Sequence, residues 1–192
     1  MKYCAECGKE VALRVPEGDH APRHVCTACG TVHYRNPKVI VGCVPEWEDR
    51  ILMCRRDIEP RRGFWTFPAG FLELRETSAE GAAREALEES RAAVDIGELF
   101  TVINCPDVGQ VYLIYRARMR SAESGTTPES SEVVLMWEDE IPWDQIAFRT
   151  IYQSLKHFYA DRAAGVIGKV HVFDLPERPP YNSRGPAPTG PT

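Results

Sequence analysis

Apolar residues gather in the middle of the chain, between residues 37 and 163, where they recur with the periods of strands and of helices. The apolar runs Lys38–Val44 and Arg50–Cys54 flank the polar segment Glu46–Asp49 and predict a β-hairpin. In two longer stretches the apolar residues return every three or four positions, which predicts helices with one buried face. We therefore expect a mixed α/β domain. The other predicted strands are Leu99–Ile103, Gln110–Met119 and Val133–Trp137, and the predicted helices run from about Thr77 to Ser90 and from about Phe148 to Arg162.

The two ends of the chain lack this pattern. Residues 1–33 contain four of the seven cysteines and three of the five histidines. From Pro176 onward, six of the fifteen prolines fall within 17 residues, and such a segment buries too little apolar surface to offset its ordering entropy. We therefore expect a small module over residues 1–35, one folded domain over 36–163, and an extension over 164–192 that is disordered from about residue 176.

Charge and hydropathy argue against two classes of partner for the chain as a whole, nucleic acids and membranes. Its 192 residues carry 23 lysines and arginines against 28 aspartates and glutamates, a net charge of −5, which argues against a nucleic-acid or anionic-membrane binder. The longest apolar run, Val39–Pro45, is far shorter than the ~20 residues that span a bilayer. The start of the chain shows no targeting segment, and a cytoplasmic protein is expected. A reducing compartment also suits Cys43, Cys54 and Cys105 as free, buried thiols.

The other four cysteines form two Cys-x-x-Cys pairs, each followed directly by glycine. Two residues between the ligands let a tight turn direct both sulfurs at one Zn²⁺ ion, which four thiolates bind tetrahedrally. The alternatives are four unrelated thiols or a redox-active pair, and the second glycine-punctuated pair argues against both. A structural zinc is therefore predicted, with His20, His24 and His33 as nearby surface residues. The predicted zinc ligands are Cys4, Cys7, Cys26 and Cys29.

The predicted helix that begins at Thr77 has an unusual acidic side. Thr77 and Glu80 have the spacing of a capping box, which fixes the helix start. Three glutamates near the other end fall within an arc of roughly 100°, on a flank different from the expected buried face. The glutamates are Glu85, Glu88 and Glu89, and the expected buried face consists of Ala79, Ala82, Ala83, Ala86 and Leu87.

These three glutamates are arranged unfavourably for a helix on its own. Like charges at positions i, i+3 and i+4 repel one another, and the C-terminal half of a helix disfavours anions. A solvated acidic face is the ordinary alternative, but a bound cation would reverse both unfavourable effects. Ligands that are all oxygens favour Mg²⁺ or Mn²⁺ over zinc, and they indicate metal-assisted attack of water on a phosphate.

The same segment matches the Nudix box, in which a glycine, a glutamate, an Arg-Glu pair and a Glu-Glu pair follow at fixed intervals. On these residues the chain resembles a Nudix hydrolase. It departs from the box at Ala86 and Ala92, which replace larger aliphatic residues, and at Arg91, which replaces the glycine that ends the helix in the family. The matching residues are Gly70, Glu76, Arg84, Glu85, Glu88 and Glu89.

The resemblance extends to residues 1 to about 163. The cysteine pairs and the segments His33–Pro37, Phe64–Phe71 and Asp139–Trp143 look like a branch that includes zinc-ribbon bacterial enzymes and the plant plastid FAD and ADP-ribose pyrophosphatase. This implies an α/β fold, a Nudix α/β/α sandwich with a mixed sheet, preceded by a small zinc ribbon and usually dimeric. It also implies hydrolysis of a nucleoside diphosphate linked to another moiety.

The resemblance also implies roles for the box residues. The residues that match Glu85, Glu88 and Glu89, with the carbonyl of the one that matches Gly70, bind the divalent metal in such enzymes. The arginine that matches Arg84 typically pairs with the glutamate that matches Glu76 and holds the loop against the helix.

The base that activates water differs among Nudix enzymes, some of which use an acid on a later loop. Glu129 and Glu132 lie in a Gly/Ser/Thr-rich segment just before a predicted strand. Glu132 is slightly favoured as this base. That both are ordinary acidic loop residues is an equally weighted alternative.

Several residues near the box suit a nucleotide-type substrate. Arg55 and Arg56 can neutralise phosphate charge, while Phe64, Trp65 and Tyr112 can stack on adenine or flavin, although aromatic residues beside a sheet are more often core.

The substrate itself is less well indicated. NADH pyrophosphatases carry a Ser-Gln-Pro-Trp stretch that is absent between Ala92 and Arg120, and Pro106 lies near a proline typical of ADP-ribose pyrophosphatases. We therefore rank ADP-ribose and FAD above NADH or an NAD cap. The alternative from another class is a catalytically silent Nudix fold whose zinc ribbon is a binding module.

Overall fold

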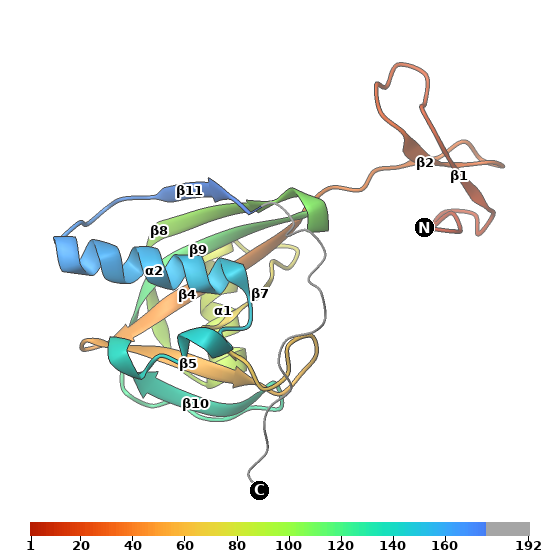
Figure 1. The fold of residues 1–192 in the computed structure, drawn as a ribbon. Coiled ribbons are helices and arrows are strands. Elements are labelled where there is room, and N and C mark those ends of the chain that lie inside the picture. Colours follow the sequence, from red (N-terminus) through yellow and green to blue (C-terminus); the bar gives the residue numbers. More distant parts are fainter. Residues whose placement is uncertain (176–192) are drawn as a thin grey trace, which may run out of the picture. The chain divides into compact units, whose positions relative to one another are not determined.

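The computed structural model describes residues 1–175, so the proline-rich segment expected to be disordered lies outside the described residues. Contacts within the chain divide it into two units, one from Met1 to Pro37 and one that begins at Lys38 (Figure 1). Among the described residues, no helix combines the length and the apolar character needed to cross a membrane.

The N-terminal unit is a small antiparallel sheet built around the cysteine pairs. Its three strands lie in the order β1-β2-β3. The first pair precedes β1, and the second begins at Cys26, the last residue of β2. The two turns that carry the cysteines are thus held at one end of the same short sheet. The strands are β1 (Val11–Arg14), β2 (Arg23–Cys26) and β3 (Val32–His33).

The second unit is built on an eight-stranded mixed sheet. Six strands follow the order β10-β5-β4-β9-β8-β11, while β6 pairs with β5 and β7 pairs with β4. The pairs β4–β9 and β8–β11 are parallel and the others antiparallel. The strands are β4 (Lys38–Trp47), β5 (Arg50–Arg56), β6 (Trp65–Thr66), β7 (Ala69–Phe71), β8 (Val94–Cys105), β9 (Gln110–Met119), β10 (Ser130–Met136) and β11 (His171–Asp174).

Two helices cover opposite faces of this sheet (Figure 1). Successive residues of a strand point to opposite faces, and Leu52 and Met53 of β5 accordingly enter different clusters of buried side chains. Leu52 packs with Ala82 and Ala86 of α1, whereas Met53 packs with the cluster that contains Phe158 of α2. The expected α/β/α sandwich with a mixed sheet is confirmed. The helices are α1 (Ser78–Ser90) and α2 (Arg149–Ala164), with short 3₁₀ turns η1 (Pro106–Val108), η2 (Glu138–Glu140) and η3 (Trp143–Gln145).

The predicted elements of this unit are present, with shifted ends. The hairpin forms between β4 and β5, where Glu46 pairs with Ile51. Strand β8 begins at Val94, five residues before the predicted start at Leu99, because register shifts on either side of Leu99 break the alternation that the sequence pattern relies on.

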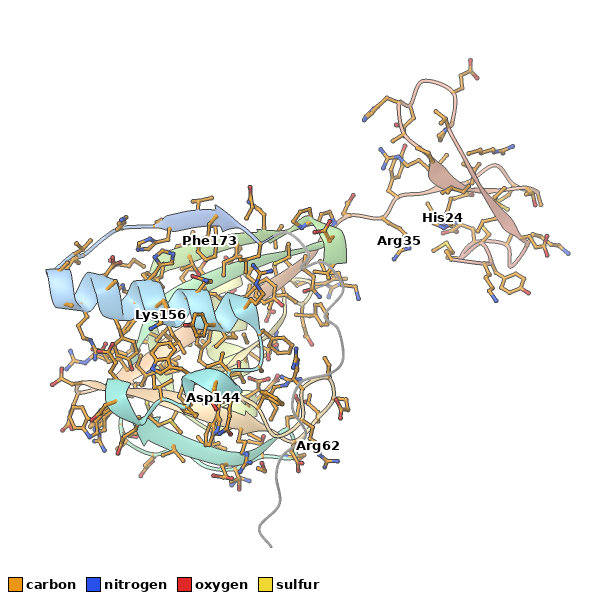
Figure 2. The ribbon with its side chains drawn as sticks, viewed as in Figure 1. His24, Arg35, Arg62, Asp144, Lys156 and Phe173 are labelled. Atoms are coloured by element: carbon orange, nitrogen blue, oxygen red, sulfur yellow. The ribbon has the colours of Figure 1, made fainter. Side chains whose placement is uncertain are left out.

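Strands β6, β7 and β11 were missed. The first two contain only two and three residues, too few for a period to be visible. In β11, His171 is the one buried residue, so the strand carries no apolar alternation. The ring of Phe173 on β11 lies 5.2 Å from that of His157, so this strand packs against α2 as well as pairing with β8 (Figure 2).

Helix α1 begins as predicted but buries a different face. Thr77 caps it, its side chain accepting a hydrogen bond from the backbone N–H of Glu80, and the capping box is complete. The expectation for its buried face was wrong in two respects: Leu87 is 56% exposed, and two of the glutamates lie on the buried side. The helix is turned so that carboxylates rather than a leucine face β7, where the backbone N–H of Ala69 donates a hydrogen bond to the carboxylate of Glu89. The buried residues are Gly81, Ala82, Glu85, Ala86, Glu89 and Ser90.

The end of α1 shows how the chain manages without the box glycine. Arg91 adopts the left-handed conformation with φ 59°, and its N–H donates to the carbonyl of Leu87 at 2.8 Å. The capping geometry typical of glycine is therefore kept, with an arginine in a conformation that residues with a Cβ atom disfavour.

We expect Arg91→Gly to stabilise the protein. Glycine adopts a positive φ without strain, so the free energy of unfolding should rise by about 0.5–1 kcal/mol. Urea denaturation of the two proteins measures this difference. Arg91→Ala is the matched control, because it removes the same side chain but keeps Cβ and should bring no gain. A gain of equal size in Arg91→Ala would show that the arginine side chain, and not the backbone, is unfavourable.

Candidate active site

The four N-terminal cysteines converge as the sequence predicted. All four sulfurs lie within 4.8 Å of one another. The Cys4–Cys29 sulfurs are 3.7 Å apart, and the Cys7–Cys26 and Cys7–Cys29 pairs are each 3.5 Å apart. Four sulfurs about 2.3 Å from one zinc ion would be about 3.8 Å apart. The cluster therefore fits a tetrahedral Zn²⁺ site whose four positions are all taken by protein.

Hydrogen bonds favour the thiolate form at two of the four cysteines, whereas at Cys7 the neighbouring sulfurs raise the pKa against a backbone hydrogen bond from Lys9. Hydrogen bonding from Thr31, whose hydroxyl lies 3.1 Å from the Cys29 sulfur, lowers the pKa of Cys29 to about 6. The backbone N–H of Cys29 is the main cause of a lowered pKa at Cys26. His33, expected to be a surface residue, is half-buried and places Nε2 3.2 Å from the Cys4 sulfur. It therefore supports the site from outside the set of four sulfurs.

Loss of one sulfur should empty this site. A Cys26→Ser variant offers three thiolates, so bound zinc measured by atomic emission should fall from about one ion per chain to near zero. Cys105→Ser, which removes a buried thiol of the other unit, is the matched control and should keep its zinc. Unchanged zinc in Cys26→Ser would contradict a four-thiolate site.

In the second unit the box residues meet around Arg84. Its Nε and Nη2 atoms donate to the two carboxylate oxygens of Glu76, at 3.0 and 2.8 Å, and Nη2 also donates to the carbonyl of Phe71 at 3.0 Å. Pairing with Arg84 lowers the pKa of Glu76 to about 2. The backbone N–H of Glu73 donates to Glu76 as well, at 2.7 Å. The loop between β7 and α1 is thus held to the middle of the helix.

Glu85 and Glu89 lie one turn apart on the buried side of α1. Their exposed fractions are 8% and 7%. Burial raises the pKa of Glu89 to about 8, against a hydrogen bond from the N–H of Ala69 at 3.0 Å, and burial also raises the pKa of Glu85. A Cβ atom at Gly70 would collide with the carboxylate of Glu85. Glycine at this position therefore makes the room that Glu85 occupies.

The third glutamate, Glu88, is exposed and joins the set through Arg84. The Nη1 atom of Arg84 donates to Glu85 at 2.8 Å and to Glu88 at 2.9 Å. Arg84 thus bridges Glu85 and Glu88, Glu85 lies against Gly70, and Glu89 reaches the N–H of the adjacent Ala69. Glu85 and Glu89 have too little water around them to be stable as isolated anions. Oxygen donors in this number and setting fit Mg²⁺ or Mn²⁺.

The two candidate loop acids have different surroundings. Glu132 forms an ion pair with Arg55, with Nη1 2.6 Å from its carboxylate. Glu129 lies close enough to the box carboxylates for its charge to raise the pKa values of both Glu85 and Glu89. The preceding Thr127 donates to the carbonyl of Glu89 at 3.4 Å. The loop that carries Glu129 is therefore attached to the end of α1.

The candidate substrate-binding residues are divided between surface and core. Trp65 is 7% exposed and belongs to the core cluster, and Tyr112 packs against the same cluster. The core interpretation is the better one for Trp65, whose ring has no free face. Phe64 is half-buried beneath the guanidinium of Arg61. The positive charge of Arg56 is felt at Glu89, where it lowers the pKa, so this arginine lies nearer the carboxylates than the sequence alone could tell.

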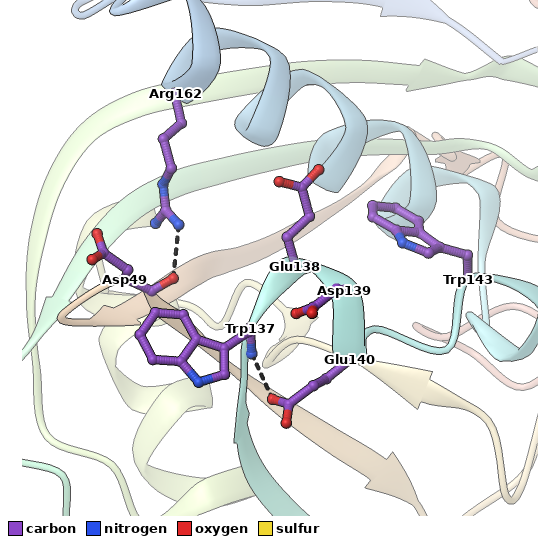
Figure 3. Close-up of a pocket in the computed structure, with 7 residues that line it drawn as sticks. All are labelled: Asp49, Trp137, Glu138, Asp139, Glu140, Trp143 and Arg162. Carbon is purple, nitrogen blue, oxygen red and sulfur yellow. Dashed lines mark hydrogen bonds between the residues drawn. The ribbon is translucent and has the colours of Figure 1, made fainter.

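A separate cleft of about 850 Å³ lies elsewhere in this unit (Figure 3). It contains no residue of the predicted site. Arg162 crosses it to donate to the carbonyl of Asp49 at 2.8 Å, and the N–H of Trp137 donates to Glu140 at 2.9 Å. The cleft is lined by Asp49, Trp137, Glu138, Asp139, Glu140, Trp143 and Arg162.

Fold and site together define a class of protein: an α/β/α sandwich in which one glutamate-rich helix and the loop before it form an oxygen-donor site. Comparison with family models names the class. Residues 36–161 match the NUDIX domain and residues 2–35 match the model described as Nudix N-terminal, a zinc ribbon. The chain belongs to the Nudix family.

Individual relatives agree with this assignment. A crystal structure of a NUDIX hydrolase from Nitrosomonas europaea superposes with a TM-score of 0.86 at 49% identity, covering 91% of this chain and all of that one. A MutT-like protein from Streptomyces ambofaciens is 34% identical over 53% of this chain and 64% of its own length.

Two further relatives bear the names of specific activities. An ADP-ribose pyrophosphatase from Methanocaldococcus jannaschii is 34% identical over 38% of this chain and 44% of its own length. The NAD-capped RNA hydrolase NudC from Edwardsiella ictaluri is 34% identical over 48% of this chain and 34% of its own length. The chain thus spans less than two thirds of each of these curated relatives.

The burial of Glu89 predicts how stability depends on pH in the absence of metal. The pKa of this carboxyl rises from 4.5 to about 8 on folding. Below pH 4.5 the carboxyl is protonated in both the folded and the unfolded protein. Between pH 4.5 and about 8 it ionises freely only in the unfolded protein. The free energy of unfolding, measured without added Mg²⁺ or Mn²⁺ and without a chelator that would remove the structural zinc, should therefore fall by roughly 1–3 kcal/mol between pH 5 and 8.

Glu89→Gln is the matched control for this pH dependence. The amide keeps the shape of the side chain and does not titrate, so the fall should be smaller in this variant by the contribution of Glu89. Parallel pH curves for the two proteins would show that Glu89 ionises as readily in the folded state as in the unfolded state.

Proposed function

We propose that this protein is a pyrophosphatase that hydrolyses a nucleoside diphosphate linked to another moiety, with Mg²⁺ or Mn²⁺ as cofactor. The observation that carries the proposal is the pair of buried carboxylates, Glu85 and Glu89, held beside Gly70 by a loop that Arg84 fixes to the helix. Such carboxylates stay ionised at neutral pH when a cation neutralises them. A catalytically silent fold would have no need to keep them in the interior.

Each residue of the box has a role in this proposal. Glu85, Glu88 and Glu89, with the carbonyl of Gly70, would hold the cations, which supply an activated water and offset phosphate charge. Arg84 and Glu76 keep the loop, and with it Gly70, in place. Arg56, whose charge reaches Glu89, is placed to bind a phosphate oxygen of the substrate, and Arg55 lies next to it on β5.

For the base we favour Glu129 over Glu132, which the sequence had slightly favoured. The carboxylate of Glu132 is already engaged by the guanidinium of Arg55 at 2.6 Å. Glu129 accepts no side-chain ion pair among the described contacts, and its charge is felt at both buried glutamates. A base must lie within reach of the water that it deprotonates, and the loop anchored by Thr127 brings Glu129 toward that place.

For the substrate we rank ADP-ribose, cleaved to AMP and ribose 5-phosphate, and FAD, cleaved to AMP and FMN, above NADH or an NAD cap. One relative bears the name ADP-ribose pyrophosphatase, and another is named an NAD-capped RNA hydrolase. Both names describe a diphosphate that links a nucleoside to another group, which supports this substrate class. A homodimer belongs to the same proposal on the family resemblance alone. A reducing, cytoplasmic compartment is proposed as well, because the three buried cysteines of this unit are free thiols.

A substrate panel tests the proposed activity. The purified protein with Mg²⁺ or Mn²⁺ should release AMP from ADP-ribose or FAD faster than from NADH or nucleoside triphosphates. Glu88→Gln, which changes an exposed side chain, should lower kcat by about 10²-fold without unfolding the protein. Absence of turnover on every substrate would refute the enzyme and favour the alternative, a binding module.

The base is tested separately on the active substrate. Glu129→Gln should lower kcat by about 10²–10⁴-fold and flatten the pH dependence of the rate. Glu123→Gln, on an exposed part of the same loop, is the matched control and should leave kcat unchanged. A larger loss in Glu132→Gln than in Glu129→Gln would reverse the assignment.

A further inference from the structure

The guanidinium of Arg84 is divided between two tasks. Its Nε and Nη2 atoms hold Glu76 and the carbonyl of Phe71, which belong to the loop between β7 and α1. Its Nη1 atom holds Glu85 and Glu88, which belong to the helix. A guanidinium has five N–H groups, and these five hydrogen bonds use all of them.

The two tasks differ in their relation to the proposed cation. Neither Glu76 nor Phe71 is a proposed cation ligand, whereas both acceptors of Nη1 are. Glu85 is the more confined of the two, being buried and lying against Gly70. A cation bound by Glu85 and Glu88 would compete with Nη1 for the same carboxylates and would repel its positive charge. The conflict concerns one nitrogen of the guanidinium and leaves the other two undisturbed.

We propose that Arg84 is a split clamp: without metal its Nη1 substitutes for the cation between Glu85 and Glu88, and metal loading displaces this nitrogen while Nε and Nη2 stay on the loop. The inference rests on the proposed function, because it requires a divalent cation at these carboxylates. Arg84 is in this sense a positioning residue. In the unloaded site it offsets the repulsion between Glu85 and Glu88, which lie three positions apart on the helix. With or without metal, it holds the loop that carries Gly70 in place.

The arrangement has a consequence for the loop. If the whole guanidinium were released on loading, Glu76 would lose both of its hydrogen bonds from Arg84, and the loop would lose its attachment to α1. Because the fork to Glu76 is bidentate, and therefore geometrically fixed, release of Nη1 alone leaves this attachment intact. Metal loading is then a local exchange of partners and does not rearrange the loop.

Side-chain NMR of the full chain labelled with ¹⁵N-arginine tests the clamp. The Arg84 signals are assigned by their loss in Arg84→Lys, and Mg²⁺ is added to the wild-type protein while calorimetry on the same sample measures binding. We expect the slowly rotating Nη1 signal of Arg84 to be lost on saturation, with the Nε and Nη2 signals retained. Arg162, which donates to Asp49 and Glu46 on another part of the unit, is an internal control and should not respond.

The outcomes separate the clamp from the metal site. Heat of Mg²⁺ binding with an unchanged Nη1 signal would overturn the clamp and leave the proposed metal site standing. Heat of binding with loss of all Arg84 signals would overturn the division of the guanidinium, because the loop would then be released as well. Absence of any heat would overturn the metal site itself, and the clamp with it.

Discussion

The desolvation of two carboxylates, Glu85 and Glu89, is the constraint on which the rest of the second unit depends. Burying an isolated carboxylate is strongly unfavourable. The residues around this pair offset that cost or make room for the two side chains. Ala69 gives a backbone N–H to Glu89, and Gly70 leaves out the Cβ atom that would occupy the place of Glu85. The small side chains of α1 let the helix approach the sheet closely enough for β7 to make both contacts.

This constraint extends outward through Arg84 to the loop between β7 and α1. The loop contributes little apolar surface: Leu72 packs against the core at the start of the loop, whereas Leu74 is 95% exposed. Its position comes from the bidentate pairing of Glu76 with Arg84 and from the capping box at Thr77. Hydrogen bonds that involve charged groups are the stronger kind, and here they replace a core. The loop is thereby rigid enough to present the backbone of Gly70 beside Glu85.

The features of the fold and of the site that could be predicted are those determined by residues close together in the sequence. The clustering of the four cysteines, the start of α1 at Thr77 and the strands with clear alternation were predicted because neighbours in the sequence determine them. The burial of Glu85 and Glu89 was not predicted, because a helical pattern assigns glutamates to the solvent-facing side. Their burial depends on contact with β7, a strand too short to be recognised in the sequence. The ion pair between Arg55 and Glu132, which lie 77 positions apart, was invisible in the sequence for the same reason, and our proposal of Glu129 as the base rests on it. Arg91 shows the converse. Residues with a Cβ atom disfavour the left-handed conformation, yet the folded chain holds Arg91 in it.

The two metal-type sites of the chain solve the problem of gathered negative charge in opposite ways. In the N-terminal unit neutral donors, the backbone N–H of Cys29 and the hydroxyl of Thr31, approach the sulfurs, and no cationic side chain of lysine or arginine is bonded to them among the described contacts. Four soft ligands close around one ion, which suits permanent binding. In the second unit a cationic side chain already lies between Glu85 and Glu88, and the proposed Mg²⁺, held by hard oxygen ligands, would keep several positions for water or phosphate. If the arginine takes the place of the ion as we propose, the glutamate site is suited to repeated exchange of metal and product, whereas the cysteine site is suited to holding its unit together.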